Sequence, residues 1–308
     1  MPTCVSNFNE PKNMIRKKTK REIVCTLSAL VVALCVTLTG WQRGKTEVSL
    51  PVKIVILHTN DTHSQVEPIA PGAKNEGRGG YARRMGLIER FRNEEPELLL
   101  LDAGDFSQGT PYFNFYNGRV EIDALNRMKY DVATLGNHEF DNGVDTLAAV
   151  LSEARFAVVC ANYQVKGTPL EGIVKPYVIL FRKGVKIGIL GLGVCPDGLI
   201  APQNFAPLRW ENPLPVANEV ADFLRNRKHC DLIVCLSHLG TDPNGSPVCD
   251  AWLAENTRNI DVIIGGHTHK VIENRHLTNL DGHDVVLAQM GKSGINLGRI
   301  VVELDAKR

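Results

Sequence analysis

Residues 52–64 read VKIVILHTNDTHS, an apolar run that passes directly into polar side chains able to bind a metal ion. The same order recurs at four later points of the chain. An apolar stretch typical of a buried strand comes first, and Asp, Asn or His follows it. The later copies are LLLLDAGD at 98–105, ATLGNHEFD at 133–141, LIVCLSHLG at 232–240 and VIIGGHTHK at 262–270. We therefore expect these polar residues on loops at the C-terminal ends of strands.

Amphipathic stretches lie between the apolar runs. Within 214–227, for example, Val216, Val220, Phe223 and Leu224 fall on one helical face. Alternation of this kind predicts an α/β fold with helices on the outer faces, and the β-rich ending indicates a second sheet. The expected architecture is a four-layer α/β/β/α sandwich. Its expected strands cover 53–58, 98–102, 132–135, 156–161, 185–192, 232–237, 262–265, 285–289 and 300–304, and its expected helices cover 81–94, 120–129, 144–154 and 214–227.

In an open α/β sheet, the loops after the strands gather in one crevice, where ligands bind. We expect seven candidate metal ligands to converge there. A set of carboxylate, imidazole and amide groups without thiolate fits a hydrolytic dimetal centre better than a structural zinc site. The candidates are Asp61, His63, Asp105, Asn137, His238, His267 and His269.

The individual ligand signals differ in strength. Asp61 and His63 stand two apart, which places both on one side of an extended or turning backbone. Asp105 by itself is typical of a turn or a helix cap, and His238 by itself of a core histidine. A carboxylate buried after an apolar strand is nevertheless costly unless it meets a cation or strong donors. The two glycines before His267 favour a tight turn.

The segment GNHEFD at 136–141 is the most specific signal. The Asn137 carbonyl oxygen is a neutral metal ligand. His138 need not bind metal, because its imidazole can point at the substrate and donate a proton or hydrogen bond to a phosphate oxygen. Asp141, three residues later, is placed to orient that imidazole and raise its pKa. His138 and Asp141 are therefore the catalytic candidates.

Composition narrows the class of protein. The chain has 308 residues and a formal net charge of +1, which argues against binding to a nucleic-acid polymer or a membrane surface. Its eight cysteines include no CxxC pair, so neither a disulfide framework nor a zinc ribbon is indicated. Cys160, Cys230 and Cys235 border or occupy apolar runs and are expected to be small buried side chains.

The N-terminal segment predicts export. Residues 12–21 are basic and residues 23–38 are apolar, a secretory signal pattern too short for the roughly 20 residues of a spanning helix. We expect residues 1–41 to be a signal peptide region, 42–51 a linker and 52–308 one catalytic domain. Met14 is an alternative start, which would make residues 2–13 an upstream extension. The expected location is the periplasm or cell surface of a bacterium, with membrane contact only through an uncleaved signal segment.

The blocks DxH, GD, GNHE, an isolated H and GHxH, in this order over residues 52–308, resemble the calcineurin-like metallophosphoesterase superfamily. HTNDTHS, LDAGD, GNHEFD and GGYARR at 79–84 resemble more closely the N-terminal catalytic domain of 5′-nucleotidase-type enzymes. That resemblance implies one divalent metal on Asp61, His63, Asp105 and His269, and a second on Asp105, Asn137, His238 and His267.

Asp105 would then bridge two cations, which would acidify a water and clamp phosphate oxygens. Mn or Zn is the favoured metal, with Fe or Co as alternatives. By the same resemblance, His138, supported by Asp141, would stabilise the phosphoryl group or protonate the leaving oxygen. Arg83 or Arg84 could contact substrate, but an arginine on a helix surface is the preferred interpretation.

Full-length enzymes of the 5′-nucleotidase type carry a second, C-terminal domain that binds the nucleoside, and this sequence ends at Arg308, where the catalytic domain would end. A separate nucleotide-binding subunit, broad specificity or a substrate other than a nucleotide would explain this. We expect an exported dimetal phosphohydrolase acting on nucleotides or related small phosphomonoesters. A phosphodiesterase acting on 2′,3′-cyclic nucleotides and a non-catalytic phosphate- or metal-binding subunit of a larger assembly are the alternatives.

Overall fold

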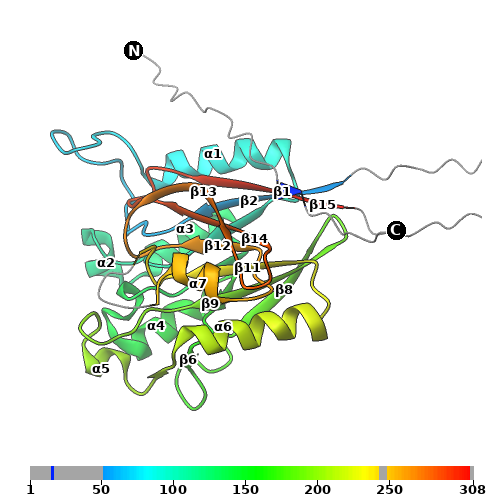
Figure 1. Ribbon diagram of the computed structural model, residues 1–308. Helices are drawn as coiled ribbons and strands as arrows, with labels where there is room; N and C mark the ends of the chain where they lie inside the picture. Colours follow the sequence, from blue (N-terminus) through cyan, green and yellow to red (C-terminus); the bar gives the residue numbers. More distant parts are fainter. Residues whose placement is uncertain (1–14, 17–50, 243–247, 306–308) are drawn as a thin grey trace, which may run out of the picture.

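Two β-sheets lie face to face in the centre of the protein, and helices cover their outer faces (Figure 1). The computed structural model describes residues 15–16, 51–242 and 248–305. The first sheet has the order β1 (Ile15–Arg16), β15 (Gly298–Leu304), β2 (Val52–Thr59), β3 (Leu99–Asp102), β4 (Val132–Thr134), β5 (Ala157–Val159) and β7 (Val174–Lys175). The second has the order β13 (Val271–Thr278), β14 (Asp284–Met290), β12 (Val262–Gly265), β11 (Leu232–Ser237), β9 (Val185–Leu192) and β8 (Tyr177–Arg182).

The central strands of both sheets are parallel. β2, β3, β4, β5 and β7 pair in this way, and so do β9, β11, β12 and β14. The strands β15, β8 and β13 pair antiparallel with β2, β9 and β14. Since parallel strands end on the same edge of a sheet, the loops that follow β2, β3, β4, β11 and β12 leave each sheet on one side.

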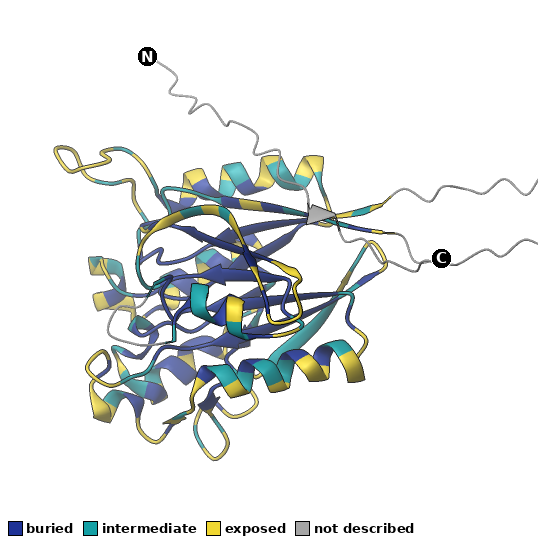
Figure 2. Ribbon diagram, in the orientation of Figure 1, coloured by how far each residue is buried: buried dark blue, intermediate teal, exposed yellow. Residues whose placement is uncertain are grey.

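Three hydrophobic layers hold the sheets and helices together. The middle layer joins the two sheets through residues such as Ile56, Leu101, Ile189 and Val234. One outer layer packs the first sheet against α1 (Tyr81–Glu94), α3 (Arg119–Met128) and α4 (Gly143–Leu151). The other packs the second sheet against α6 (Pro213–Asp222) and α7 (Asp250–Asn256). Figure 2 shows this buried interior, and the predicted α/β/β/α sandwich is confirmed.

All nine predicted strands and all four predicted helices are present, with shifts of a few residues at their ends. The predicted helix 214–227 consists of two parts: the α-helix α6 ends at Asp222, and a π-helix follows from Phe223 to Arg227. Cys160, Cys230 and Cys235 are buried and unpaired, as expected. Most of the elements that the sequence did not predict are short or polar, but β8 is a six-residue apolar strand that was missed. The unpredicted elements are β1, β6 (Tyr163–Gln164), β7, β8, β10 (Arg209–Trp210), β13, α2 (Pro111–Tyr116), α5 (Pro202–Phe205), α7 and a 3₁₀ turn (His138–Phe140).

The proposed signal region 1–41, apart from residues 15–16, and linker residues 42–50 lie outside the described residues. None of the helices that the structure describes is both long and apolar enough to cross a membrane. The division into signal region, linker and catalytic domain therefore stays a prediction.

The layer between the sheets predicts a local stability effect. Leu232, at the start of β11, is fully buried in it. Leu232→Ala should lower the free energy of unfolding by about 2–5 kcal/mol, because it removes apolar contacts and leaves a cavity. The matched change Leu280→Ala, at an exposed position, should cost less than about 0.5 kcal/mol. Urea-induced unfolding measures both, and equal losses would contradict this account of the core.

Candidate metal centre

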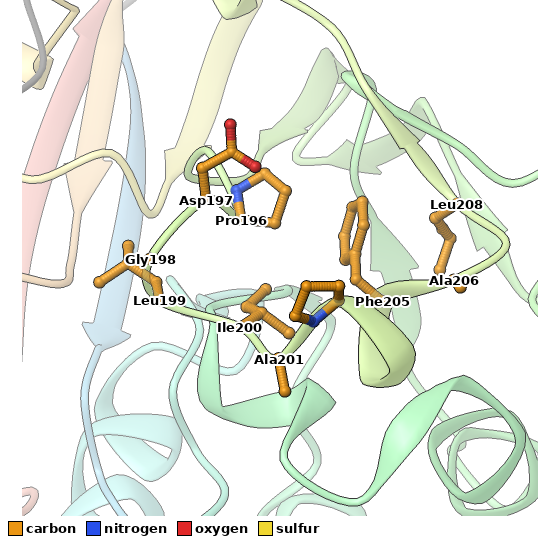
Figure 3. Close-up of a pocket in the computed structure, with 10 residues that line it drawn as sticks. Pro196, Asp197, Gly198, Leu199, Ile200, Ala201, Phe205, Ala206 and Leu208 are labelled. Carbon is orange, nitrogen blue, oxygen red and sulfur yellow. The ribbon is translucent and has the colours of Figure 1, made fainter.

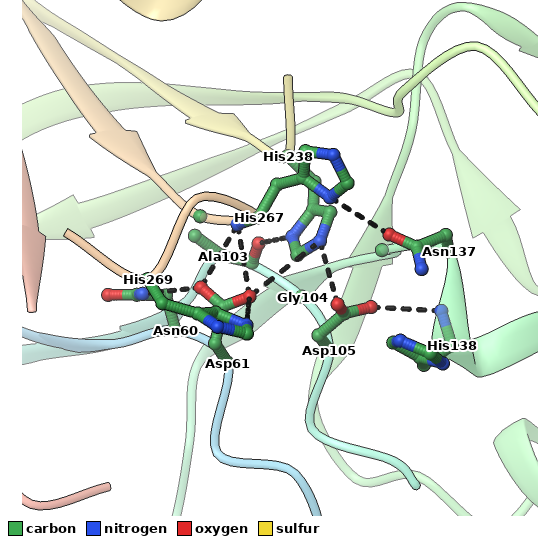
Figure 4. A network of polar contacts seen from close by, with 12 residues as sticks. Asn60, Asp61, Ala103, Gly104, Asp105, Asn137, His138, His238, His267 and His269 are labelled. Atoms are coloured by element: carbon green, nitrogen blue, oxygen red, sulfur yellow. Dashed lines mark hydrogen bonds and ion pairs between the residues drawn. The ribbon is translucent and has the colours of Figure 1, made fainter. Parts of the chain in front are cut away.

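The nine residues predicted from the sequence lie together where the strands of both sheets end. Figure 4 shows the centre of this site, with Asp105 between Asp61 and Asn137. The first sheet supplies residues after β2, β3 and β4, and the second supplies residues after β11 and β12. They are Asp61, His63, Asp105, Asn137, His138, Asp141, His238, His267 and His269. The site therefore forms only when the two sheets pack together.

Asp105 lies in the middle of the site and is only 2% exposed. One carboxylate oxygen, Oδ2, lies 3.0 Å from Nε2 of His238, and the other accepts a hydrogen bond of 2.9 Å from the backbone N–H of His138. The carboxylate thus faces ligands from both sheets at once. This is the position that a shared ligand of two cations requires.

On one side of Asp105, two imidazoles meet the carboxylate of Asp61. The Nε2 atoms of His63 and His269 lie 2.9 Å apart, and Nε2 of His269 lies 3.4 Å from Oδ1 of Asp61. The backbone N–H of His267 donates to both carboxylate oxygens of Asp61 at 3.0 Å, which fixes that carboxylate in place.

On the other side, His238 and His267 pack edge to face, with ring centroids 5.4 Å apart. Nδ1 of His267 lies 3.1 Å from the side-chain oxygen of Asn137. Nδ1 of His238 lies 2.7 Å from the backbone oxygen of Ala103, to which it donates a hydrogen bond. That bond leaves Nε2 of His238 as the atom that faces the site, an arrangement common for metal-binding histidines.

The arrangement fits metal ions. Three groups of side chains each bring their donor atoms within 4.8 Å of one another: Asp61, His63 and His269; His63, Asp105 and His138; and Asp105, His238 and His267. Nδ1 of the buried His63 has no hydrogen-bond partner among the described residues, and Nε2 of His238 has only its close ion pair with Asp105. Oxygen and imidazole donors suit Mn, Zn, Fe or Co, and cations here would satisfy groups that the protein leaves unpaired.

The pKa shifts show how strongly Asp105 and His238 stabilise each other's charge. Burial opposes ionisation of Asp105, yet the neighbouring His238 holds the pKa of that carboxyl well below its usual range. Burial likewise opposes charge on His238, but Asp105 raises the pKa of its imidazole to about 10. Burial lowers the pKa of His63 to about 4, so this imidazole is neutral at pH 7, the form that coordinates a metal.

The backbone at five of the seven candidate ligands is left-handed. The φ angles are 48° at Asp61, 46° at His63, 55° at Asp105, 71° at His267 and 55° at His269. The turning alternative for Asp61 and His63 is therefore the correct one, and the extended alternative is wrong. Such conformations cost of order 1–3 kcal/mol each and persist where the surrounding structure imposes them.

Glycines give the side chains their space. A Cβ atom on Gly136 would lie 2.2 Å from Oδ1 of Asp105, and one on Gly266 would lie 2.7 Å from Nδ1 of His238. Both distances are far below van der Waals contact, so glycine is required beside the two central ligands.

His138 and Asp141 form the expected pair. Nδ1 of His138 lies 2.9 Å from Oδ2 of Asp141, and this hydrogen bond raises the pKa of the imidazole against the opposing effect of burial. The segment after β9 contacts the turn that carries this pair. Nδ2 of Asn204 donates to the backbone oxygen of Asp141 at 2.8 Å, and the rings of Phe205 and Phe140 pack 5.2 Å apart.

Glu139 is a structural part of the site that the sequence did not reveal. Its buried carboxylate accepts hydrogen bonds from three backbone N–H groups: Asp105 at 2.9 Å, Ser107 at 3.0 Å and Gly136 at 2.6 Å. It therefore ties the loop after β3 to the loop after β4. Burial and the nearby Asp105 raise its pKa to about 7. The sequence offered one signal for this role, because Glu139 directly follows the candidate site residues Asn137 and His138.

The preferred interpretation of Arg84 is wrong. Its side chain is 5% exposed and packs inward, with the guanidinium 5.1 Å from the ring centre of Tyr81. Tyr81, Arg84 and Ile88 lie three and four residues apart on the buried face of α1, which explains its direction. Arg83 is exposed, as expected for a helix-surface arginine.

Two hollows lie near the strand ends. The smaller, of about 300 Å³, opens onto His63, His138 and His269, and its other lining residues are Gln65, Gln108, Gly109, Lys292 and Ser293. The larger, of about 530 Å³, is formed by the loop after β9 and is mostly apolar, with Ile200, Phe205 and Leu208 in its wall (Figure 3). Phe205 therefore contributes both to this hollow and to the packing behind Phe140.

Comparisons with known proteins agree with this geometry. Residues 54–271 match the family model described as calcineurin-like phosphoesterase. A 5′-nucleotidase of Homo sapiens is 31% identical over 278 residues, which cover 83% of this chain and 47% of the relative. The crystal structure of a 5′-nucleotidase precursor from Thermus thermophilus aligns with a TM-score of 0.72 and 32% identity, covering 81% of this chain and 51% of the other.

The calcineurin-like phosphoesterase YfkN from Bacillus subtilis aligns with a TM-score of 0.68 and 26% identity, covering 83% of this chain and 86% of the other. The chain spans about half the length of the 5′-nucleotidases that it matches. The family match, residues 54–271, includes all nine candidate site residues.

The contacts of Glu139 predict an effect on metal binding. Glu139→Gln should weaken metal affinity about 10- to 100-fold, because an amide cannot accept all three backbone hydrogen bonds that position Asp105. Titration of the metal-free protein with Mn²⁺ or Zn²⁺ measures this. Glu153→Gln, at an exposed ion pair with Arg119, is the control. Equal affinity in both variants would remove Glu139 from the support of the site.

Proposed function

The chain belongs to the calcineurin-like phosphoesterase family, and we propose that it is a dimetal phosphohydrolase that releases phosphate from nucleotides or related phosphomonoesters. The observation that carries this proposal is the position of Asp105 between two groups of ligands. Asp61, His63 and His269 lie on one side of it, and Asn137, His238 and His267 on the other. Asp105 is thus placed to be common to both cation sites.

Two divalent cations held there would supply Lewis acidity toward phosphate oxygens and lower the pKa of a bound water. The protein's own part is to fix the geometry. Asp61 is held by the backbone N–H of His267, and His238 by the backbone oxygen of Ala103. These bonds orient the donor atoms before substrate arrives, so little reorganisation is needed during reaction.

His138 supplies the proton-donating group. Asp141 occupies Nδ1, so Nε2 is the atom left to donate to a phosphoryl oxygen or to the leaving oxygen. His138 lines the same hollow as His63 and His269, which places its ring beside the space where the phosphate would bind. Removing the His138 proton donor would leave the two cation sites in place, but the transferred phosphoryl group would be stabilised less well.

Nucleotides are the proposed substrate class because curated relatives of this chain include 5′-nucleotidases. Those relatives are about twice as long as the matched segment. Binding to a separate nucleotide-binding subunit is a further part of the proposal. We also propose export to the periplasm or cell surface, which the basic and apolar pattern at residues 12–38 supports. The mature N-terminus, read by mass spectrometry, tests export, and an intact Met1 or Met14 would count against a cleaved signal.

Metal dependence is the first test of this function. The full chain loaded with Mn²⁺ or Zn²⁺ should release phosphate from a nucleoside 5′-monophosphate and from 4-nitrophenyl phosphate, and a chelator should abolish both reactions. A 2′,3′-cyclic nucleotide, assayed alongside, distinguishes a phosphodiesterase. Preference for that diester would replace the monoesterase proposal. Absence of metal-dependent release from all three would favour a non-catalytic binding subunit.

His138 offers a second test. His138→Asn should lower kcat by about 100-fold or more, because the proton donor is lost. Metal content should stay unchanged, since His138 is outside the two proposed ligand sets. His283→Asn, away from the site, is the matched control and should retain normal turnover. A His138→Asn enzyme with the control's rate would exclude this imidazole from the reaction.

A further inference from the structure

The hollow that opens onto the candidate metal centre has lining residues that the proposed chemistry does not use. The imidazoles of His63, His138 and His269 form part of its lining. Lys292 and Ser293, from the loop between β14 and β15, and Gln108, from the loop after Asp105, line it as well. Its volume of about 300 Å³ is at the lower end of small-ligand sites. There is room beside the transferred phosphate for another small group.

The backbone around Lys292 is fixed to the metal centre. The N–H of Ser293 donates to the backbone oxygen of Asp61 at 2.7 Å, and the N–H of Gly291 donates to the backbone oxygen of Lys270 at 2.8 Å. Asp61 is a proposed ligand, and Lys270 follows the proposed ligand His269. Lys292 is therefore held between two anchored neighbours, while its own side chain is exposed at the hollow.

The charge of Lys292 is available for a ligand. Among the residues that the structure describes, no carboxylate lies within ion-pair distance of its ammonium group. The nearby Lys270 differs, because Asp242 pairs with it. An unpaired ammonium at the mouth of an anion-binding hollow attracts phosphate as a compact point charge.

Gln108 lines the same hollow in a constrained conformation. Its φ angle is 65°, a left-handed value that is costly for glutamine. The next residue, Gly109, approaches His63 so closely that a Cβ atom there would lie 2.7 Å from the backbone oxygen of His63. The amide of Gln65 is bonded to the backbone oxygen of Glu67, whereas that of Gln108 has no bonded partner among the described residues. Gln108 thus offers an unused amide donor on a constrained backbone.

We propose that Lys292, together with Gln108, forms a second anion subsite that binds a phosphate group next to the one being transferred. It would favour phosphoesters with two linked phosphates, such as nucleoside diphosphates, over those with one. This inference rests on the proposed phosphohydrolase function, because the first phosphate must occupy the metal centre. The oxygen that bridges the two phosphates is then the leaving oxygen, within the role already proposed for His138, while the lysine contributes charge and the glutamine contributes a hydrogen bond to the second phosphate.

Competitive inhibition separates the two anion positions. Inorganic phosphate and pyrophosphate would be compared as inhibitors of 4-nitrophenyl phosphate hydrolysis by the full chain, at a fixed free metal concentration. Lys292→Met should raise the inhibition constant of pyrophosphate about tenfold more than that of phosphate, a difference of about 1.4 kcal/mol. Lys292→Arg should restore most of the difference. Lys166→Met, at an exposed loop position, should leave both constants unchanged.

Two results would overturn the subsite. One is a pyrophosphate constant that does not respond to Lys292→Met. The other is an equal rise for both inhibitors, which would mean that the lysine binds the transferred phosphate itself. Calorimetric binding of pyrophosphate to the metal-loaded wild type and Lys292→Met proteins gives the same comparison without turnover. Failure of the proposed function, seen as absent metal-dependent hydrolysis, is thereby distinguished from failure of the subsite.

Discussion

A buried carboxylate at the junction of two sheets is the constraint on which the rest of the site depends. Asp105 follows β3 of the first sheet and faces His238, which follows β11 of the second. An ionised carboxylate in that position is costly unless cations or strong donors surround it. The imidazoles, the backbone N–H of His138 and the proposed metal ions all serve that requirement. The chemistry of the site therefore depends directly on the packing of the two sheets.

The local backbone bears the cost of this arrangement. Left-handed conformations at Asp61, Asp105 and His267 would relax if the surrounding loops were free to move. The sheets beneath them hold these loops. Glu139 also ties the loop of Asp105 to the loop after β4, and the backbone N–H of His267 binds the carboxylate of Asp61. Rigid loops keep donor atoms in place before a ligand arrives. The stability of the fold therefore keeps the candidate ligands in unfavourable backbone conformations that place their donor atoms correctly.

The sequence predicted the central strands and the candidate ligands because buried parallel strands are continuous apolar runs, each followed by its polar loop. It did not predict β13, where exposed and half-buried residues alternate without an apolar run. The direction of Arg84 was missed because a charged side chain is usually assigned to the surface, although its spacing from Tyr81 and Ile88 pointed inward. Glu139 acts through tertiary contacts, and Lys292 reaches the hollow only because its loop meets the loop of Asp61; one sequence does not reveal which distant loops will meet.

Sharing of Asp105 between two cations is the central claim, and metal content per chain tests it most directly. Elemental analysis of the purified, metal-loaded protein should give two divalent ions per chain. Asp105→Asn should reduce both occupancies, because the amide removes the charge that both sites share, whereas His269→Ala should reduce only one. One ion per wild-type chain, or one site that is unaffected by Asp105→Asn, would contradict the account.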